Sequence, residues 1–289
     1  MNTNFEIINE CRISNSKDLT KVLDLGLQPL ANSLKKKQFD NEDRYPLSLS
    51  FCEKSSLLQL NETIKKEILF DSYVWVTSTS STAQNYSQTF YKNAIKNTQL
   101  DKNNDLIIEI ASNDGTFLKP FVNNGFRKVF GVDPAQNISE LANRNHIQTI
   151  NEYWTEELAE NLLKNHGSAK LVFARNVIPH VKHIHSVIEG IRAFLKDDGK
   201  GIIEFHNVSL ILDQLHYDYI YHEHLFYFSL KTINGLLQMH DLYVYDLMYS
   251  PISGGSWVVY FSKNKKLKSK ELLEVEKKEL YNELNKFSR

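Results

Sequence analysis

A short run of proton-transferring side chains stands out in this sequence. Tyr221, His222, Glu223 and His224 place a phenol, two imidazoles and a carboxylate side by side, between two apolar stretches. An imidazole oriented by a carboxylate is suited to act as a general base near neutral pH. Because adjacent side chains of an extended segment point to opposite faces, Glu223 can serve a partner other than His224. We therefore expect acid–base chemistry here.

A second polar cluster follows the apolar run that begins at Leu106. Glu109 and Asp114 flank a loop with a single glycine, Gly115, and Asp133 stands 18 residues further on, at the end of the next apolar run. Phosphate-binding loops need several glycines, and carboxylates would repel phosphates. The acids favour a cationic cofactor instead, and S-adenosylmethionine carries a sulfonium and an ammonium group. Asp133 has the spacing typical of an acid that binds ribose hydroxyls.

The pattern around these residues predicts the fold that positions them. Short apolar runs begin at Leu106, Lys128, Lys170 and Gly201, and sequences with helical spacing separate them. This alternation is typical of an α/β protein with a doubly wound parallel sheet, a Rossmann-like domain. Two further apolar runs around Gly254 and Gly255 predict an antiparallel edge to that sheet.

The chain divides into four segments by this pattern. We expect a small β-rich domain over residues 1–60 and a connector of helix and loop over residues 61–100. The cofactor-binding domain is predicted over residues 101–264, and a charged helix over residues 265–289. The Ser/Thr-rich run at residues 77–82 favours a solvated loop.

Composition excludes several classes of function. Hydrophobic residues make up 42% of the chain and charged residues 24%, as in an ordinary globular protein. The net charge of −1 gives no reason to expect nucleic acid or an anionic membrane as a partner. No apolar run is long enough to span a bilayer, the first residues do not resemble a signal peptide, and two cysteines make no disulfide framework. We expect a cytoplasmic enzyme.

Several stretches resemble one known family. The cofactor loop EIASNDGTFL and the stretches GVDPAQN, NVIPH, IYHEHLFYFSL and SGGSWVVY occur in the order found in sugar C-methyltransferases, which act on nucleotide-linked 4-keto-deoxysugars. LDLGLQPLANSL and YPLSLSFC, near the start of the chain, match as well, so the resemblance covers nearly all of residues 10–262. It implies an N-terminal zinc-binding unit, a central S-adenosylmethionine domain and a C-terminal domain that helps to hold the sugar nucleotide.

The resemblance also implies roles for individual residues. His224 would remove the proton next to the substrate ketone, and the resulting enolate would attack the methyl group, with three further residues completing the catalytic site: Tyr221, Glu223 and His180. The cofactor would be bound by Glu109, Asn113, Asp114, Gly115, Asp133, Pro134 and Asn176. The sugar substrate would be contacted by Tyr73, Asn176 and His222.

This chain departs from the family in four respects. The two C-x-x-C pairs of the zinc unit are reduced to Cys11 with Ser14 and Cys52 with Ser55, so we expect no bound zinc. Trp75 stands where a second tyrosine is usual. Ala111 opens the cofactor loop in place of a glycine. The chain ends at Arg289, before the family's C-terminal domain, which implies either a truncated chain or a different way of holding the substrate.

Three other functions stay open on sequence grounds. The enzyme could methylate a different acceptor, for example at oxygen, or it could be a degenerate protein that binds the cofactor without turnover. A metal-dependent hydrolase is the weakest alternative, because no H-E-x-x-H motif is present and the histidines do not share one helix face: His180, His183, His185, His222 and His224. The oligomeric state is not predicted.

Overall fold

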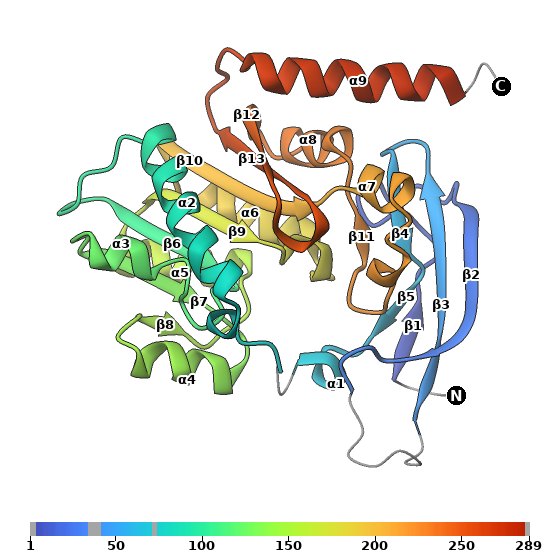
Figure 1. The fold of residues 1–289 in the computed structure, drawn as a ribbon, viewed down its shortest axis with the longest axis horizontal. Helices are drawn as coiled ribbons and strands as arrows, with labels where there is room; N and C mark the ends of the chain where they lie inside the picture. Colours follow the sequence, from blue (N-terminus) through green and yellow to red (C-terminus); the bar gives the residue numbers. More distant parts are fainter. Residues whose placement is uncertain (1–3, 34–41, 71–73, 287–289) are drawn as a thin grey trace.

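The computed structural model describes residues 4–33, 42–70 and 74–286 (Figure 1). Its largest element is a seven-stranded sheet with the order β12-β13-β10-β9-β6-β7-β8. Five strands are parallel: β6 (Leu106–Ile110), β7 (Lys128–Val132), β8 (Thr149–Ile150), β9 (Ala169–Arg175) and β10 (Leu195–His206). The antiparallel edge is formed by β12 (Tyr243–Ser250) and β13 (Ser256–Ser262). This confirms the predicted Rossmann-like fold with an antiparallel edge.

The parallel strands are buried on both faces. Alternate residues of one strand enter different hydrophobic clusters, as Ile107 and Ile108 do in β6. One face packs against α2 (Ser81–Asn97), α3 (Lys119–Asn123) and α4 (Gln136–Arg144), and the other against α5 (Glu156–His166) and α6 (Ile184–Phe194). This two-sided burial explains why the strands appear in the sequence as unbroken apolar runs.

Small sheets at the N-terminal end confirm the expected β-rich unit. A two-stranded sheet pairs β1 (Phe5–Ile7) with β5 (Glu62–Ile64). A four-stranded sheet, ordered β11-β4-β3-β2, contains β2 (Thr20–Pro29), β3 (Arg44–Cys52) and β4 (Leu57–Leu60). Its fourth strand, β11 (Phe226–Tyr227), comes from the other end of the chain and pairs with β4. The Tyr221 to His224 run, just before β11, is therefore carried on an extension of the small sheet.

The remaining elements are short or lie at the periphery. They are α1 (Lys66–Phe70), α7 (Val208–Asp213), α8 (Leu230–Gln238), α9 (Lys270–Lys286) and the 3₁₀ turns η1 (Thr77–Thr79), η2 (Ile178–His180), η3 (Tyr217–Tyr219) and η4 (Ile252–Gly254). The charged helix expected over residues 265–289 begins at Lys270 and lies beside α8 and β12 (Figure 1). No helix in the described part of the chain is both long and apolar enough to cross a bilayer.

A chain of imidazole contacts joins the small domain to the large one. His185 Nε2 donates a hydrogen bond to the carbonyl of Ile13 over 2.9 Å, and its Nδ1 lies 2.8 Å from His240 Nε2. His240 Nδ1 in turn lies 2.8 Å from Glu189 Oε1. His185 therefore belongs to the domain junction. Within the described residues, no group of three or more histidines, cysteines or acids is placed to hold a metal ion.

Candidate active site

A cavity of about 760 Å³ lies at the carboxyl ends of the parallel strands. This is where ligands of doubly wound sheets bind, and the volume is within the range of small-molecule sites. One half is lined by the ends of β6 and β7, including Glu109, Asn113 and Asp133. The other half is lined by η2 and the segment before β11, including His180 and His224. The structure thus brings the two predicted polar clusters to one cavity.

The loop after β6 is held in a strained conformation. Ala111, Asn113 and Gly115 have φ angles of 53°, 50° and 78°. A side chain on Gly115 would also place its Cβ 2.5 Å from Ile147 Cγ2, so glycine is required by both conformation and space. Gly115 itself does not line the cavity; it shapes the loop whose other residues do.

Asp133 sits where a ribose-binding acid is expected. It ends β7, is 6% exposed and lines the cavity next to Pro134. Its Oδ2 accepts the backbone N–H of Asn113 over 2.8 Å and its Oδ1 accepts that of Ala135 over 3.0 Å. Burial raises its pKa despite these hydrogen bonds. Each carboxylate oxygen keeps a second lone pair, so the geometry leaves room for ribose hydroxyls.

Glu109 is a buried carboxyl group in the lining of the cavity. It is 2% exposed, and its Oε2 has no hydrogen-bond partner among the described residues. Burial raises its pKa well above the ordinary value, against the opposing effect of the Arg175 charge. Arg175 Nε donates to Glu204 Oε2 over 2.7 Å, and its guanidinium lies 3.2 Å from the centre of the Phe117 ring. Glu109 and Arg175 line the cavity, whereas Glu204 lies behind Arg175 and does not.

The acceptor half is organised around His224. Its Nδ1 donates to the carbonyl of Tyr219 over 2.9 Å, which leaves Nε2 as the acceptor for the Tyr221 hydroxyl, 3.1 Å away. Burial lowers the pKa of His224 to about 3 and that of His180 to about 4. The rings of His180 and His224 lie 4.7 Å apart. Both imidazoles are therefore neutral at neutral pH, and the His224 tautomer is fixed by a backbone carbonyl.

Glu223 and His222 do not line the cavity. Glu223 Oε1 accepts a hydrogen bond from Asn32 Nδ2 over 2.7 Å, so its partner is indeed not His224. His222 is 1% exposed, and its Nε2 lies 3.3 Å from the carbonyl of Tyr45. The expected substrate contact of His222 does not agree with this placement. Its side chain instead anchors the segment to β3, because residues 221–224 form a turn, in which the His224 N–H donates to the Tyr221 carbonyl over 3.1 Å, and not an extended strand.

Sequence reasoning missed several residues that line the cavity. Asn32 reaches it from the small domain, Arg175 from the end of β9 and His206 from the end of β10. The His206 ring stacks on Tyr219 at 3.9 Å between centroids, and burial lowers its pKa to about 4. Arg175 and His206 could have been found as polar residues ending apolar runs. Nothing local in the sequence points to Asn32.

The remaining predicted residues differ in their relation to the cavity. Asp114, expected to face the cofactor, is 4% exposed, and its Oδ1 accepts the Thr116 hydroxyl over 2.7 Å. Asn176 does line the cavity, with a φ angle of 50°. Trp75 is 56% exposed at the cavity mouth. Tyr73 lies outside the described residues.

The four positions of the degenerate zinc unit converge, but their chemistry does not suit zinc. Cys11 Sγ lies 3.0 Å from Ser55 Oγ, and Cys52 Sγ lies 3.5 Å from Ser14 Oγ. Burial raises the pKa of the Cys52 thiol, but hydrogen bonds from Ser14 and Ser55 outweigh it and lower the pKa to about 7. Serine hydroxyls are poor zinc ligands, so two of four positions cannot serve.

Two family models match the chain. A model for a zinc-binding domain matches residues 11–70, and a methyltransferase domain model matches residues 84–247. The first covers all four positions of the degenerate zinc unit. The second covers more than half of the chain, including the strained loop and the cavity.

Individual proteins agree with these matches. The C-methyltransferase NovU of Streptomyces niveus is 33% identical over 255 residues, which is 88% of this chain and 60% of NovU. This chain thus spans less than two thirds of that relative. A chain from the complex between the Trm112 methyltransferase activator and a methyltransferase of Haloferax volcanii superposes with a TM-score of 0.50 at 11% identity, covering 63% of this chain and 92% of its own. At that identity the likeness shows the fold alone.

Proposed function

This chain belongs to the methyltransferase-domain family, and we propose that it methylates a carbon atom of a nucleotide-linked 4-keto-deoxysugar with S-adenosylmethionine as the donor. The observation that carries the proposal is the hydrogen-bonded pair of Tyr221 and His224, which faces the same cavity as the Asp133 loop. A methyl acceptor at carbon needs a base, whereas many other acceptors do not. The similarity to a C-methyltransferase supports the same acceptor chemistry.

The cofactor half fits S-adenosylmethionine. Asp133 would hold the ribose, and the buried Glu109 carboxyl, with one unpartnered oxygen, would face positive charge. When bound there, the cofactor supplies an electrophilic methyl group. Asn176 and Pro134 complete the lining on either side.

The acceptor half supplies proton transfer. We place Tyr221 between the substrate and His224: its oxygen takes the proton from the carbon next to the ketone while its own proton passes to His224 Nε2. The C–H electron pair then forms an enolate, and its carbon becomes the nucleophile. Burial holds His224 neutral beforehand, and the negative enolate favours the charged ring afterwards. His180 and His206, on the same wall, are the candidate donors to the enolate oxygen.

The proposal is tested with labelled S-adenosylmethionine and a panel of nucleotide-linked 4-keto sugars. We expect label to appear on a carbon of one of them, and we expect that substrate to exchange its α-proton with deuterated water before any methyl donor is added. Transfer of label to oxygen without α-proton exchange would replace C-methylation by O-methylation. Binding of cofactor without transfer to any acceptor in the panel would contradict the proposed substrate class.

A further inference from the structure

The segment of residues 74–79, here called the entrance segment, runs beside the cofactor loop at the mouth of the cavity. Its Ser/Thr-rich part was expected to be a solvated loop, but the backbone is held by the cofactor loop. The N–H of Thr77 donates to Asn113 Oδ1 over 2.9 Å, and the N–H of Ser78 donates to Asp114 Oδ2 over 3.0 Å. Asn113 Nδ2 donates to the carbonyl of Trp75 over 3.0 Å.

These bonds use the side chains that were expected to bind the cofactor. Both polar atoms of the Asn113 amide bond the entrance segment. Of the two Asp114 oxygens, one accepts from Ser78 and the other from the backbone and hydroxyl of Thr116. Asp114 does not line the cavity at all. Their geometry is that of positioning residues and not of cofactor ligands.

The same residues connect the entrance segment to Asp133. The backbone N–H of Asn113 donates to Asp133 Oδ2, in the left-handed conformation that directs its side chain to the entrance segment. A path of hydrogen bonds therefore runs from the acid proposed for the ribose, through one residue, to Trp75 and Thr77. This path joins Asp133 to the entrance segment.

The entrance segment presents apolar side chains to the cavity mouth. Val74 and Trp75 both line the cavity, although they are 61% and 56% exposed. Large apolar side chains kept exposed at a cavity mouth are suited to cover a ligand that enters there. The position of Val74 and Trp75 depends on the backbone bonds of the entrance segment to Asn113 and Asp114. Trp75 takes part in them through its carbonyl.

We propose that Asn113 and Asp114 position the entrance segment, so that Trp75 contacts the methyl acceptor and cofactor bound at Asp133 strengthens acceptor binding. The inference rests on the proposed function of the same cavity. Coupling of this kind is reciprocal, so bound acceptor also strengthens cofactor binding. Trp75 then sets acceptor specificity.

Hydrogen exchange tests the positioning role without any acceptor. Asn113→Gly removes the amide and keeps the φ of 50° without strain. We expect exchange of the Thr77 and Ser78 amides to become about tenfold faster or more, as expected for loss of roughly 1.4 kcal/mol of local stability. Asn151→Ala is the matched control: Asn151 Nδ2 donates to the carbonyls of Asp133 and Pro134 and does not touch the entrance segment. Equal exchange in wild type and Asn113→Gly would overturn the proposal.

Two further measurements separate positioning from cofactor binding. S-adenosylmethionine should slow exchange at Thr77 and Ser78 in wild type and in Asn151→Ala, but not in Asn113→Gly. With an active acceptor, Asn113→Gly and Asp114→Asn should raise the KM for acceptor about tenfold while the cofactor Kd changes less than about threefold. A tenfold rise of the cofactor Kd with an unchanged acceptor KM would make Asn113 a cofactor ligand. The exchange results stand even if the panel of keto sugars contains no acceptor, so the two proposals can fail separately.

Discussion

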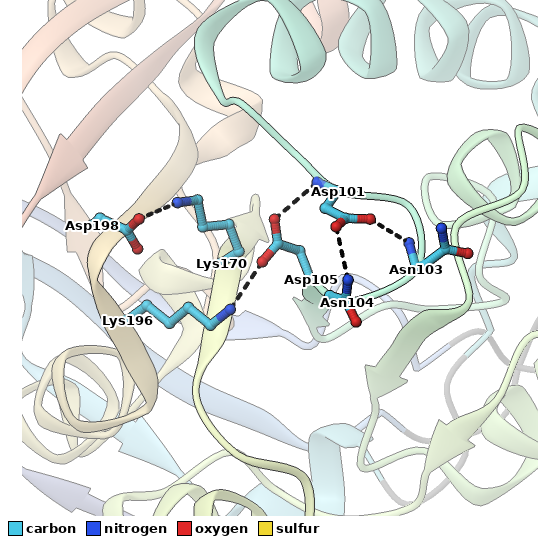
Figure 2. A network of polar contacts seen from close by, with 7 residues as sticks. All are labelled: Asp101, Asn103, Asn104, Asp105, Lys170, Lys196 and Asp198. Carbon is cyan, nitrogen blue, oxygen red and sulfur yellow. Dashed lines mark hydrogen bonds and ion pairs between the residues drawn. The ribbon is translucent and has the colours of Figure 1, made fainter.

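At the amino edge of the seven-stranded sheet charged side chains satisfy one another, whereas at the carboxyl edge several do not. Figure 2 shows the amino edge: Asp105 accepts from the Asp101 backbone over 2.9 Å and pairs with Lys196 over 2.9 Å, and Lys170 pairs with Asp198. At the carboxyl edge, Glu109 Oε2 and Glu204 Oε1 have no hydrogen-bond partner in the described chain.

The backbone differs between the edges in the same way. Ala111, Asn113 and Asn176 have positive φ angles at the ends of β6 and β9, and the described residues from 101 to 105 have none. Strain and unsatisfied polar groups lower stability, so they persist where a ligand later compensates for them. One edge of the sheet is therefore satisfied internally, whereas the other keeps strained backbone and unpartnered polar atoms around the cavity.

The largest expected effect is on turnover at the carboxyl edge. His224→Gln should reduce kcat about 10²- to 10⁴-fold, because the proton from Tyr221 then has no acceptor. The cofactor Kd, measured by titration calorimetry, should stay within about threefold of wild type. The same variant should lose α-proton exchange with deuterated water. If exchange continues at the wild-type rate, the proton does not pass through Tyr221 to His224, and His180 becomes the candidate base.

A smaller effect is expected on cofactor binding. Asp133→Ala removes a carboxylate that would face the ribose and releases the N–H groups of Asn113 and Ala135. We expect the Kd for S-adenosylmethionine to rise about 10- to 100-fold, in line with charge-assisted hydrogen bonds. Asp105→Asn at the amino edge is the control and should leave the Kd unchanged. Equal affinities for wild type and Asp133→Ala would remove Asp133 from the binding site.

The edges should also differ in their response to acid. Folded-state pKa values of about 4 for His180 and about 3 for His224 lie below the ordinary 6.5, because both rings are buried. Below pH 6.5 the unfolded chain binds protons that the folded chain does not, so stability is lost as pH falls. As the pH falls from 6.5 to 5, the two histidines together should lower the free energy of unfolding by about 3 kcal/mol.

Denaturant titrations at both pH values measure that loss. A variant with His180→Asn and His224→Gln should lose about 3 kcal/mol less than wild type over the same interval, since neither replacement titrates. The difference between the two proteins isolates these histidines from the acids. An identical loss in both proteins would mean that the rings are solvated or charged in the folded state.

At the amino edge the expected effect is on stability alone. Lys196→Met leaves Asp105, which is 8% exposed, without its cation and should cost about 1–2 kcal/mol. The double variant with Asp105→Asn should recover part of the loss. Activity and cofactor Kd should be unchanged at a temperature where both proteins are folded. A selective loss of kcat would show that the edges are not independent.

The smallest expected effect is that of chelation. The four positions of the degenerate zinc unit lie outside the cavity lining, and their thiols and hydroxyls bond one another. We expect purified protein to contain no stoichiometric zinc, and EDTA to shift Tm by less than about 1 °C. Ser14→Cys with Ser55→Cys supplies four thiols and should gain one zinc and sensitivity to chelator. One zinc per chain in the unaltered protein would contradict the prediction.

The sequence predicted the sheet and pointed to the loop after β6 because their signals are local. Apolar runs buried on both faces mark β6 to β10, and the single-glycine loop and Asp133 follow two of these runs directly. Gly115 is required by its φ and by Ile147, which a sequence pattern can indicate. Such features depend on residues close together in the chain.

The acceptor half was only partly predictable because it is made of distant segments. The resemblance pointed to Tyr221 and His224, but the Asn32 bond to Glu223 and the burial of His222 on Tyr45 join parts of the chain far apart in sequence. Periodicity carries no information about such contacts. The bonds of Asn113 and Asp114 to residues 75–78 were missed for the same reason, since the sequence showed only a polar loop.

The pairing of β4 with β11 also constrains how the protein is made. Strands β2, β3 and β4 leave the ribosome early, but the strand that covers the edge of β4 follows almost the whole methyltransferase domain. Until residue 227 has emerged, the nascent small domain exposes that edge, and an exposed edge can pair with another chain. Sheets closed by such distant strands form slowly. The last step in building the N-terminal domain is thus the one that delivers Tyr221 and His224 to the cavity, so a chain interrupted before it has neither.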